Sequence, residues 1–391
     1  MIHPDEALKI VLSCRQRPQV ETVPLDQALG RVLAAPVASS MDQPPFSKAA
    51  VDGWAWNSEA SGLAPDSLAV RNVIAAGESD QRPLGAGETV KVMTGAPLPP
   101  GADRIQKVEC AQESDGAVRF TKPERIDNVI QRGENAREGD TIVSPRQLDA
   151  QDLAILAADG RNRVDVAVRP VVGILSTGAE LAQPGENLKP GWIYDSNRTQ
   201  LAAHLSGIAV IRDFGTLPDD YDATLAAVGS ALSQCDVLVL SGGVSMGDYD
   251  YVPKALTAAG VQTLFHGVAV KPGKPTFFGT SAKSYVFGLP GNPVSVFVNT
   301  EFLVKPLLYG LQGVEYRGLS APVTLSEGIR RGSTERVEFL PVSIDADGAK
   351  PVPYGGSSAL QALAHACGFV RLEQGQKEIS AGSVVHVRLV R

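Results

Sequence analysis

Residues 237–243 read Val-Leu-Val-Leu-Ser-Gly-Gly, an apolar run that ends in a small polar turn. A short apolar run without polar alternation is typical of a strand buried on both faces of a parallel sheet. Residues 171–178, Val-Val-Gly-Ile-Leu-Ser-Thr-Gly, repeat this pattern. Further strand patterns alternate with helical ones, at 196–205 (with Ser196 as a plausible N-cap), 210–214, 222–232, 237–240, 251–259, 261–265, 285–288 and 294–308. This order predicts a parallel α/β sheet covered by helices on both faces.

The sequence pattern changes on both sides of this region. Residues 45–130 alternate short apolar runs with turn residues, and β patterns return from about residue 317. We therefore predict a multidomain α/β plus β protein. Its predicted parts are a discontinuous helical N-terminal linking domain (1–44 and 131–169), an inserted β-rich domain (45–130), a central parallel α/β domain (170–316) and a small C-terminal β-barrel (317–391).

Composition excludes several classes of protein. With 391 residues, 43% hydrophobic and 20% charged, the chain is not of the disordered class. A net charge of −7 and 6% aromatic residues argue against a nucleic-acid partner. No run approaches the roughly 18 apolar residues of a membrane span, so no membrane association is expected. An acidic amino terminus predicts no signal peptide, and four scattered cysteines favour the cytoplasm.

Glycine-rich polar loops follow four of the predicted strands, at 176–180, 241–250, 271–274 and 290–293. In a parallel sheet such loops converge on one edge, where ligands bind. Ser241-Gly242-Gly243 offers backbone N–H groups that can wrap a phosphate. Asn292-Pro293 starts a helix whose free N–H groups suit an anion. Lys271 and Lys274 flank a rigid Pro-Gly pair and can be held toward one tetrahedral oxyanion.

Acidic residues follow the same strands: Glu180, Asp219 (or Asp220) and Asp250. Carboxylates beside phosphate-binding loops suit Mg²⁺, which commonly bridges protein carboxylates and substrate phosphates. Together with the lysines they favour cleavage of a phosphoanhydride, where a metal and cations carry the developing negative charge. The histidines and cysteines show no spacing typical of metal ligands or of a thiol nucleophile.

Eight ordered phrases resemble the molybdopterin molybdenumtransferases, the MoeA and gephyrin E-domain family, over essentially the whole chain. They are Ala50–Trp54, Met93–Pro97, Gly133–Asn135, Ser176–Leu181, Tyr194–Asn197, Ser241–Ser245, Lys271–Pro275 and Pro290–Ser295. The resemblance implies a Mg²⁺-dependent enzyme of the final step of molybdenum cofactor biosynthesis. Its substrates would be molybdate and adenylyl-molybdopterin, and it would release AMP. The resemblance also implies a cytoplasmic homodimer with the active site shared between subunits, and as candidate partners the pathway's adenylyltransferase and apo-molybdoenzymes.

The resemblance also implies roles for individual residues. Molybdate binding falls to Lys271, Lys274, Arg336 (in Glu335-Arg336-Val337-Glu338-Phe339) and Ser357 (in Gly356-Ser357-Ser358), a set of cations and a hydroxyl that suits a dianion. The catalytic set is Asp52, Thr94, Glu180, Asp219 and Asp250, with Glu180 and Asp250 on the metal and with Asp52 and Thr94 reaching in from the partner subunit. The substrate-binding set is Thr177, Gly178, Asp195, Asn197, Ser241, Gly242, Gly243, Ser245, Pro290, Gly291, Asn292, Pro293 and Ser295.

The chain departs from the family pattern at three positions. Ala179 and Asn135 stand where members often carry Asp, and Gly267 stands where some carry Lys. Each change removes a charge near the proposed site. Two alternatives therefore stay open. One is a non-catalytic paralogue that binds molybdopterin or acts as a scaffold. The other is the related adenylyltransferase, which shares the α/β domain but typically consists of that domain alone.

Overall fold

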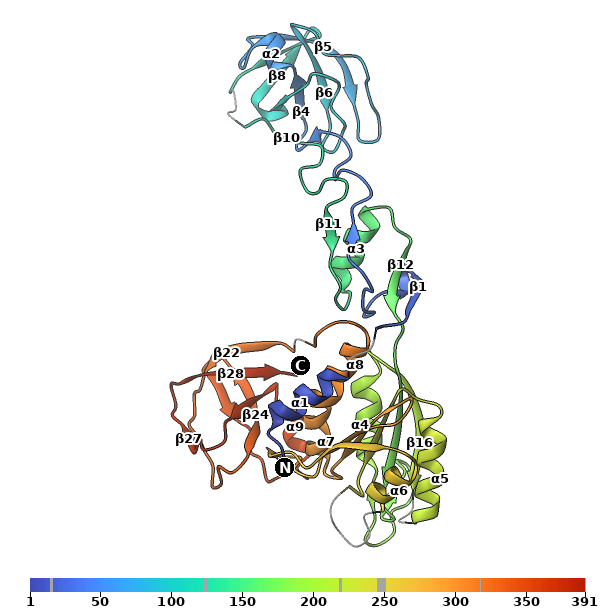
Figure 1. The fold of residues 1–391 in the computed structure, drawn as a ribbon. Coiled ribbons are helices and arrows are strands. Elements are labelled where there is room, and N and C mark those ends of the chain that lie inside the picture. Colours follow the sequence, from blue (N-terminus) through green and yellow to red (C-terminus); the bar gives the residue numbers. More distant parts are fainter. Residues whose placement is uncertain (15–16, 123–125, 218–219, 245–250, 317, 391) are drawn as a thin grey trace. The chain divides into compact units, whose positions relative to one another are not determined.

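The computed structural model describes residues 1–14, 17–122, 126–217, 220–244, 251–316 and 318–390. The chain divides into two compact units (Figure 1). The larger unit comprises Met1–Val23, Gly30–Ala34 and Asp165–Arg391, and the smaller unit comprises Pro24–Leu29 and Ala35–Val164. Both units are therefore discontinuous in sequence.

A six-stranded sheet with the order β16-β13-β17-β21-β20-β18 forms the centre of the larger unit. Its strands are β13 (Val171–Thr177), β16 (Val210–Leu217), β17 (Val237–Ser241), β18 (Gln262–His266), β20 (Phe277–Thr280) and β21 (Tyr285–Leu289). Strands β13, β16, β17 and β21 are parallel, as predicted, whereas β20 runs antiparallel between β21 and β18. The prediction of a wholly parallel sheet was wrong here, because the chain turns straight back after β18 without a crossover helix. Strand β18 still points the same way as β21, so its carboxyl end lies at the predicted edge.

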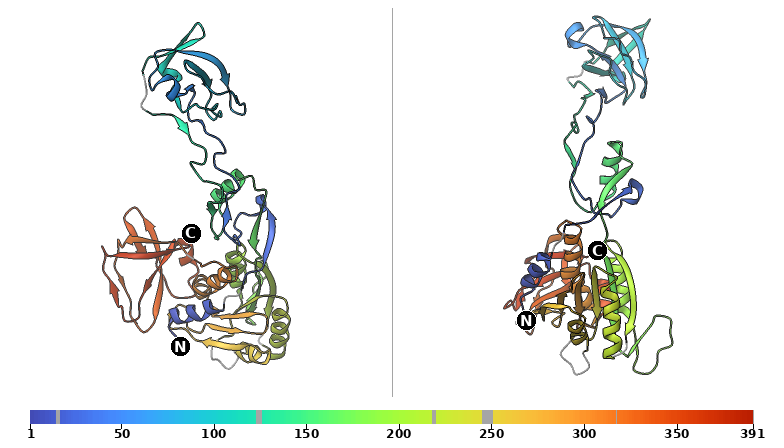
Figure 2. Two further views of the ribbon diagram at one scale, coloured as in Figure 1. Left: turned by 45° about the horizontal axis from the view of Figure 1, so that its top comes forward. Right: turned by 45° about the vertical axis from the view of Figure 1, so that its right-hand side comes forward.

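Helices cover both faces of this sheet, as the sequence predicted (Figure 2). On one face lie α1 (Pro4–Ser13), α4 (Ser196–Leu205) and a continuous helix of α7 (Pro293–Asn299), η3 (Thr300–Val304) and α8 (Lys305–Leu311). On the other lie α5 (Tyr221–Leu232) and α6 (Val252–Ala258). Alternate residues of β17 pack into the two cores, Val237 and Val239 on the first face and Leu238 and Leu240 on the second. The apolar run thus buries both faces of one strand.

The N-cap of α4 lies one residue before the residue that the sequence suggested. Asp195, not Ser196, is the N-cap, because its backbone is extended (φ −70°, ψ 90°) and its carboxylate accepts a hydrogen bond from the Arg198 N–H. Ser196 is the first helical residue. Both residue types cap helices well, and the tertiary contacts of Asp195 decide between them.

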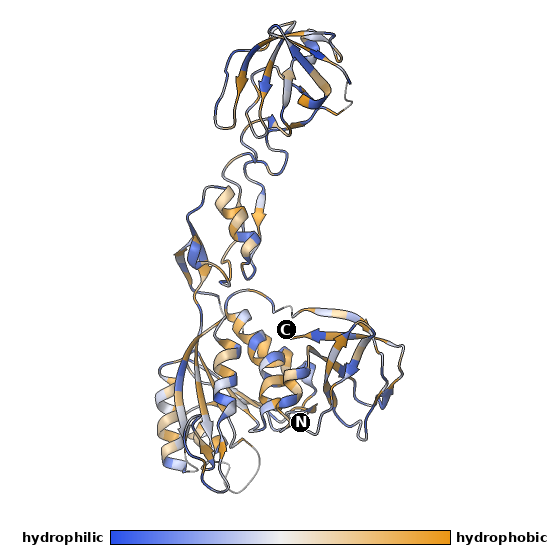
Figure 3. Cartoon of the chain, turned by 180° about the vertical axis from the view of Figure 1, so that it is seen from behind, coloured by the Kyte–Doolittle hydropathy of each residue, from blue (hydrophilic) through white to orange (hydrophobic). Residues whose placement is uncertain are grey.

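The helix Pro293–Leu311 corrects the expectation that no segment is long and apolar enough to cross a membrane. It has 19 residues and a mean hydropathy of 1.2. However, 78% of its apolar window is buried inside the protein. A core helix passes the same test, and Figure 3 shows the apolar colouring shared by this helix and the strands beside it.

The last strands of the larger unit form a second sheet with the order β19-β24-β26-β28-β22, and β25 pairs with β24. They are β19 (Val270–Lys271), β22 (Ser320–Thr324), β24 (Val337–Asp345), β25 (Gly348–Pro351), β26 (Gly368–Leu372) and β28 (Val384–Leu389). Strand β19 comes from the loop after β18 and pairs with β24, so the loop is tied to this sheet. A closed barrel stays a prediction, as does the division into four domains.

The smaller unit contains a sheet with the order β7-β4-β6-β5-β9-β8. Its strands are β4 (Gly53–Trp56), β5 (Leu68–Ile74), β6 (Glu88–Val92), β7 (Arg104–Lys107), β8 (Ala111–Ser114) and β9 (Ala117–Phe120). Trp54 and Trp56 of β4 are buried and pack in one cluster with Leu68 of β5 and Val118 of β9. The unit also holds β2 (Val37–Ala38), β11 (Thr141–Val143) and the helix α3 (Ala150–Ala158), which a capping box of Asp149 and Asp152 begins.

Phe287→Ala tests the core of the central sheet. Phe287 is fully buried on β21, with its ring 4.6 Å from that of Phe278. Its truncation should lower the free energy of unfolding by about 3–5 kcal/mol, because a cavity replaces the ring. The control, Val210→Ala on the edge strand β16 at a half-exposed position, should cost less than about 1 kcal/mol. Guanidinium unfolding followed by circular dichroism measures both, and equal losses would contradict this packing.

Candidate functional site

The carboxyl ends of β13 and β17 form the centre of the candidate site. Ser176 and Ser241 are register partners at these ends, both are buried, and their hydroxyl oxygens lie 3.1 Å apart. From β13 the chain passes through α4 to its neighbour β16, then through α5 to β17 on the opposite side. Such a reversal of strand order is where open α/β sheets bind ligands. The fold therefore places the two serines at the expected ligand crevice.

Glycine is required at both positions after Ser241. Gly242 and Gly243 have φ values of +87° and +63°, and a Cβ at Gly242 would lie 2.6 Å from the Thr177 carbonyl oxygen. A Cβ at Gly243 would lie 2.7 Å from Thr177 Oγ1. The Gly242 N–H donates to the Leu289 carbonyl at 3.0 Å. The predicted phosphate nest is therefore smaller than expected, because one of its donors already joins two strands.

Two polar side chains lie at the start of α4. That of Asp195 is hydrogen-bonded within the protein, and that of Asn197 has one oxygen without a partner among the described residues. Buried Asp195 accepts hydrogen bonds from the Arg198 N–H at 3.1 Å and from Thr216 Oγ1 at 3.2 Å, so its role is to hold the helix end. Asn197 Nδ2 donates to the Gly291 carbonyl at 2.7 Å. Asn197 Oδ1 is buried and has no hydrogen-bond partner among the described residues. A ligand with an N–H or O–H donor would satisfy it.

The start of α7 is joined to Ser357. Pro293 is the first helical residue and Asn292 the N-cap, as predicted, but the Asn292 side chain does not cap the helix. Asn292 Nδ2 instead donates to Ser357 Oγ at 2.8 Å, and the Val294 N–H donates to the Ser357 carbonyl at 3.1 Å. One of the predicted free N–H groups, that of Val294, is thereby used within the protein. The contact brings Ser357 next to the Pro290–Pro293 turn, and buried Ser295 follows in the first turn of the helix.

The loop that carries the two lysines is fastened to α7. Gly273 has a φ of +115°, and a Cβ there would lie 2.1 Å from Asn299 Nδ2. Thr276 Oγ1 donates to the Gly273 carbonyl at 2.7 Å and lies 3.0 Å from Asn299 Oδ1. Asn299 in turn donates to the Ser295 carbonyl at 2.8 Å. The loop is therefore rigid near Gly273, while the Lys271 and Lys274 residues on either side are exposed.

A buried carboxylate that the sequence analysis missed lies beside Lys271. Lys271 Nζ lies 2.8 Å from Glu338 Oε1, and the two residues are register partners on β19 and β24. Glu338 is 3% exposed, and Arg331 Nη1 lies 3.6 Å from its other oxygen. Burial and the negative charge of Glu338 raise the pKa of Tyr354 to about 12. The spacing of Arg336 and Glu338 could have indicated Glu338, because residues two apart on a strand share a face.

Arg336 lies next to the lysine loop. Its Nη1 donates to the Val270 carbonyl at 3.2 Å, directly before Lys271. The structure therefore brings Lys271, Arg336 and Glu338 together on neighbouring strands, and it ties the lysine loop and Ser357 to the same helix, α7. These two groups of contacts join the four residues predicted to bind molybdate into one region of the larger unit.

The predicted metal site lies only partly in the described residues. Asp219, Ser245 and Asp250 fall outside them. The alternative Asp220 is the N-cap of α5, where its carboxylate accepts a hydrogen bond from the Ala223 N–H at 2.8 Å. Glu180 follows Thr177 and Gly178 in the chain and is exposed. Its carboxylate lies against Gly178, because a Cβ built at Gly178 would be 2.8 Å from Glu180 Oε2. The described residues hold no group of three or more His, Cys, Asp and Glu side chains that could bind a metal.

In the smaller unit, Asp52 and Thr94 form an exposed pair. Asp52 Oδ1 accepts hydrogen bonds from the Thr94 N–H at 2.6 Å and from its hydroxyl at 2.7 Å. The hydrogen bond from the Thr94 backbone lowers the pKa of Asp52 most, and the hydrogen bond from the Thr94 hydroxyl lowers it further below its ordinary value. The carboxylate is thus held ionised in a defined orientation on the surface.

Gly242→Ala tests the close approach of β13 and β17. The variant should lose about 1–3 kcal/mol of unfolding free energy beyond the strain of a positive φ, because the new methyl meets the Thr177 carbonyl. Gly191→Ala is the matched control, since Gly191 has a φ of +84° and open space around its Cβ position. Equal losses in urea unfolding would contradict the steric argument.

Thr94→Val tests the orientation of Asp52. Removal of the hydroxyl should raise the pKa of Asp52 toward its ordinary value, while the backbone donor keeps part of the shift. Because folding lowers this pKa, the carboxylate stabilises the unit above its unfolded-state pKa, and the contribution disappears as the pH falls through the folded-state pKa. Carboxyl NMR titration measures the shift, and Thr141→Val at an exposed position of β11 should leave it unchanged.

Three family models match successive parts of the chain. Residues 2–160 match the MoeA N-terminal region (domain I and II), residues 173–310 match the probable molybdopterin binding domain, and residues 323–390 match the MoeA C-terminal region (domain IV). Between them, residues 161–172 and 311–322 are not matched.

Relatives and solved structures match over nearly the full chain. A Bacillus subtilis protein named molybdopterin molybdenumtransferase is 31% identical over 402 residues, covering 99% of this chain and 94% of the relative. The molybdopterin biosynthesis MoeA protein from Pyrococcus horikoshii OT3 has a TM-score of 0.87 at 29% identity, with both chains fully covered. Another MoeA structure has a TM-score of 0.82 at 33% identity, over 100% of this chain and 99% of that one. The chain therefore belongs to the MoeA family, whose curated relatives are named molybdopterin molybdenumtransferases.

Proposed function

We propose that this chain is a molybdopterin molybdenumtransferase that inserts molybdate into adenylyl-molybdopterin and releases AMP, in the final step of molybdenum cofactor biosynthesis. The observation that supports this most is the cationic cluster of Lys271, Lys274 and Arg336 beside the ligand crevice, joined through α7 to Ser357. Cations and a hydroxyl donor suit a tetrahedral oxyanion.

The charge of this cluster supports molybdate as the anion. Lys271, Lys274, Arg336 and Arg331 together with the Glu338 carboxylate leave a net charge of about +3 at neutral pH, opposite in sign to the −2 of molybdate. Glu338 also fixes one Lys271 ammonium proton, so that Lys271 is held on β19 rather than moving freely in solvent. We assign Glu338 a positioning role, with Lys271, Lys274, Arg336 and Ser357 contacting the substrate.

The switch point of the sheet would bind the pterin and phosphate parts of the substrate. Asn197 Oδ1 needs a donor, and the amino and ring N–H groups of a pterin supply donors of that kind. The turns at Ser241–Gly243 and Pro290–Pro293 lie at the same edge, because Gly242 and Leu289 are hydrogen-bonded. Thr177 and Gly178 border this edge from β13.

Mg²⁺ would be held by Glu180, together with Asp250 and substrate phosphate oxygens. An exposed carboxylate at a strand end fits a cation that keeps several waters and takes few protein ligands. When bound, the ion would stabilise negative charge on the phosphates during cleavage. Lys271 and Lys274 would hold the molybdate oxygens during transfer, and Asp195 would keep the start of α4 and Asn197 in place.

We further propose a cytoplasmic homodimer in which Asp52 and Thr94 of one subunit reach the site of the other. Their exposure and the preset carboxylate support such a role. The pathway's adenylyltransferase and apo-molybdoenzymes are the partners we expect. The non-catalytic paralogue is the second candidate, favoured by the charges missing at Ala179, Asn135 and Gly267. At Gly267 the backbone favours glycine, since φ is +90° and a Cβ would lie 3.3 Å from the Met1 side chain.

AMP release tests the proposed function directly. Purified protein is mixed with adenylyl-molybdopterin, molybdate and magnesium, and AMP and active cofactor are quantified. We expect stoichiometric AMP release that depends on molybdate. Tight binding of the substrate without AMP release would instead support the non-catalytic paralogue, and Ala179→Asp would be the first reversion to examine.

Lys274→Glu tests the molybdate pocket. Charge reversal should lower molybdenum insertion about 100-fold or more, because an exposed cation that faces the anion becomes a repelling carboxylate. Binding of adenylyl-molybdopterin should change little. Lys254→Glu, on the exposed face of α6, is the control and should insert normally. Insertion at the normal rate by Lys274→Glu would count against the pocket.

A further inference from the structure

A cavity of about 460 Å³ lies in the larger unit, and none of its lining residues was assigned a role above. It is bordered by α4, α7, α8 and α9 (Gln361–His365) and by Val390. Its apolar wall consists of Ala203, Phe297, Leu360, Leu363, Ala364, Ala366 and Val390, and its polar members are Gln200, His204 and Lys305. A cavity of this size with a mostly apolar lining and a few polar groups is typical of a small-molecule site.

A buried ionic cluster forms the polar end of the cavity. Glu301 is 1% exposed and lies in η3, a π-helical segment within the long helix. It accepts hydrogen bonds from His204 Nε2 at 2.5 Å and Tyr316 OH at 2.7 Å, and also from Lys305 Nζ. Burial opposes ionisation, but the His204 hydrogen bond and the Lys305 charge lower the pKa of Glu301 to about 2. Glu301 is therefore a carboxylate whose charge Lys305 already balances.

Two buried polar atoms beside this cluster have no hydrogen-bond partner in the described part of the chain, His204 Nδ1 and Gln200 Oε1. Both residues border the cavity from α4 and are four residues apart, so they share one face of that helix. Buried polar atoms in folded proteins are almost always paired. These two atoms therefore point to a polar group that the cavity receives.

We propose that this cavity binds a small carboxylate with an apolar tail. The ligand's carboxylate would accept hydrogen bonds from His204 Nδ1–H and from Lys305 Nζ. The Gln200 amide would add an N–H, since its two ends exchange by rotation. The tail would lie against Phe297 and Leu363. A cation would meet Lys305, and a purely apolar molecule would leave Nδ1 unpaired.

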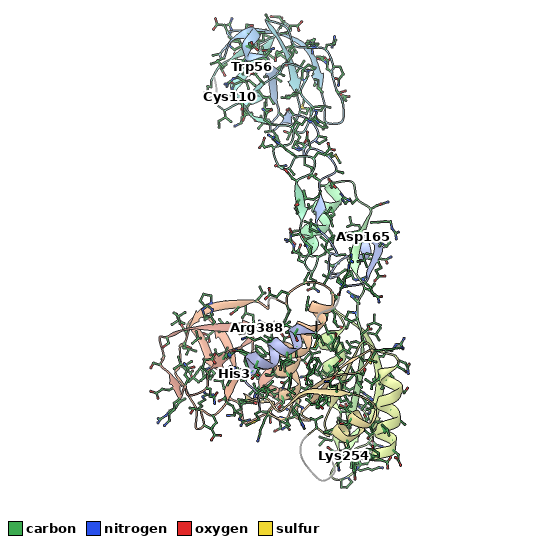
Figure 4. The ribbon with its side chains drawn as sticks, viewed as in Figure 1. His3, Trp56, Cys110, Asp165, Lys254 and Arg388 are labelled. Carbon is green, nitrogen blue, oxygen red and sulfur yellow. The ribbon has the colours of Figure 1, made fainter. Side chains whose placement is uncertain are left out.

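The charges around Glu301 leave the polar end of the cavity net positive, which favours an anionic ligand. Lys305 pairs with Glu301, and Arg388 lies beyond Tyr316, with its guanidinium 4.9 Å from the Tyr316 ring centre (Figure 4 labels Arg388). Burial and the charge of Glu301 raise the pKa of Tyr316, so its phenol stays neutral.

Hexanoate is the probe for this proposal, with hexanamide and acetate as controls. Isothermal titration at pH 7.5 should show saturable binding of hexanoate at one site. Hexanamide lacks the charge and acetate lacks the tail, so both should bind at least about 10-fold more weakly. Absence of hexanoate binding, or equal binding of hexanamide, would overturn the proposal.

Two variants locate the bound probe. Ala203→Phe fills the cavity from an exposed position of α4 without touching the ionic cluster, and it should abolish hexanoate binding. Its matched control, Ala226→Phe on the exposed face of α5, should bind normally. His204→Gln keeps a donor for Glu301 but lacks the Nδ1–H, so it should weaken hexanoate binding. If Ala203→Phe binds hexanoate like Ala226→Phe, the proposal fails, and neither readout depends on molybdenum insertion.

Discussion

The close contact between the ends of β13 and β17 is the constraint on which the candidate site depends. Gly242 and Gly243 pass so near Thr177 that no side chain fits, and the Gly242 N–H joins β17 to the end of β21. Because the strand order reverses here, this contact sets the floor of the crevice. The turns after β13, β17 and β21 are held at one edge by backbone bonds rather than by mobile side chains.

From this edge, the helix α7 positions the groups that carry charge. Its first turn is bonded to Ser357, and its Asn299 is packed against Gly273 in the lysine loop. The same loop supplies β19, which pairs with β24 and thereby brings Lys271 beside Glu338 and Arg336. Residues from three distant parts of the sequence thus meet because one helix and one short strand pair hold them. Taking these charges out of water costs folding free energy unless an anion or solvent balances the excess positive charge.

Helix α4 connects two chemically different regions of the larger unit. Its first turn, with Asp195 and Asn197, borders the crevice, and its last turn carries His204 beside Glu301 and Lys305. The ten residues of the helix separate the two regions by about 15 Å along its axis. The mostly apolar cavity beside the fully bonded Glu301 carboxylate is a different environment from the polar, glycine-rich edge of the sheet.

The sequence by itself determined the parallel strands and their glycine-rich ends. A buried strand needs an apolar run and a turn with positive φ needs glycine, and both requirements are local and visible in Val237–Gly243. It also indicated Lys271, Arg336 and Ser357 through the family phrases. Only the tertiary structure decided that β20 runs antiparallel, that Asp195 rather than Ser196 caps α4, and that the Asn292 and Val294 donors bind Ser357. Glu338 and the cluster around Glu301 were missed although each had a local signal, in the spacing of Arg336 and Glu338 and in Lys305 four residues after Glu301. Their other partners, Lys271 and His204, lie 67 and 97 residues away, and long-range pairing of charges leaves no periodic pattern in the sequence.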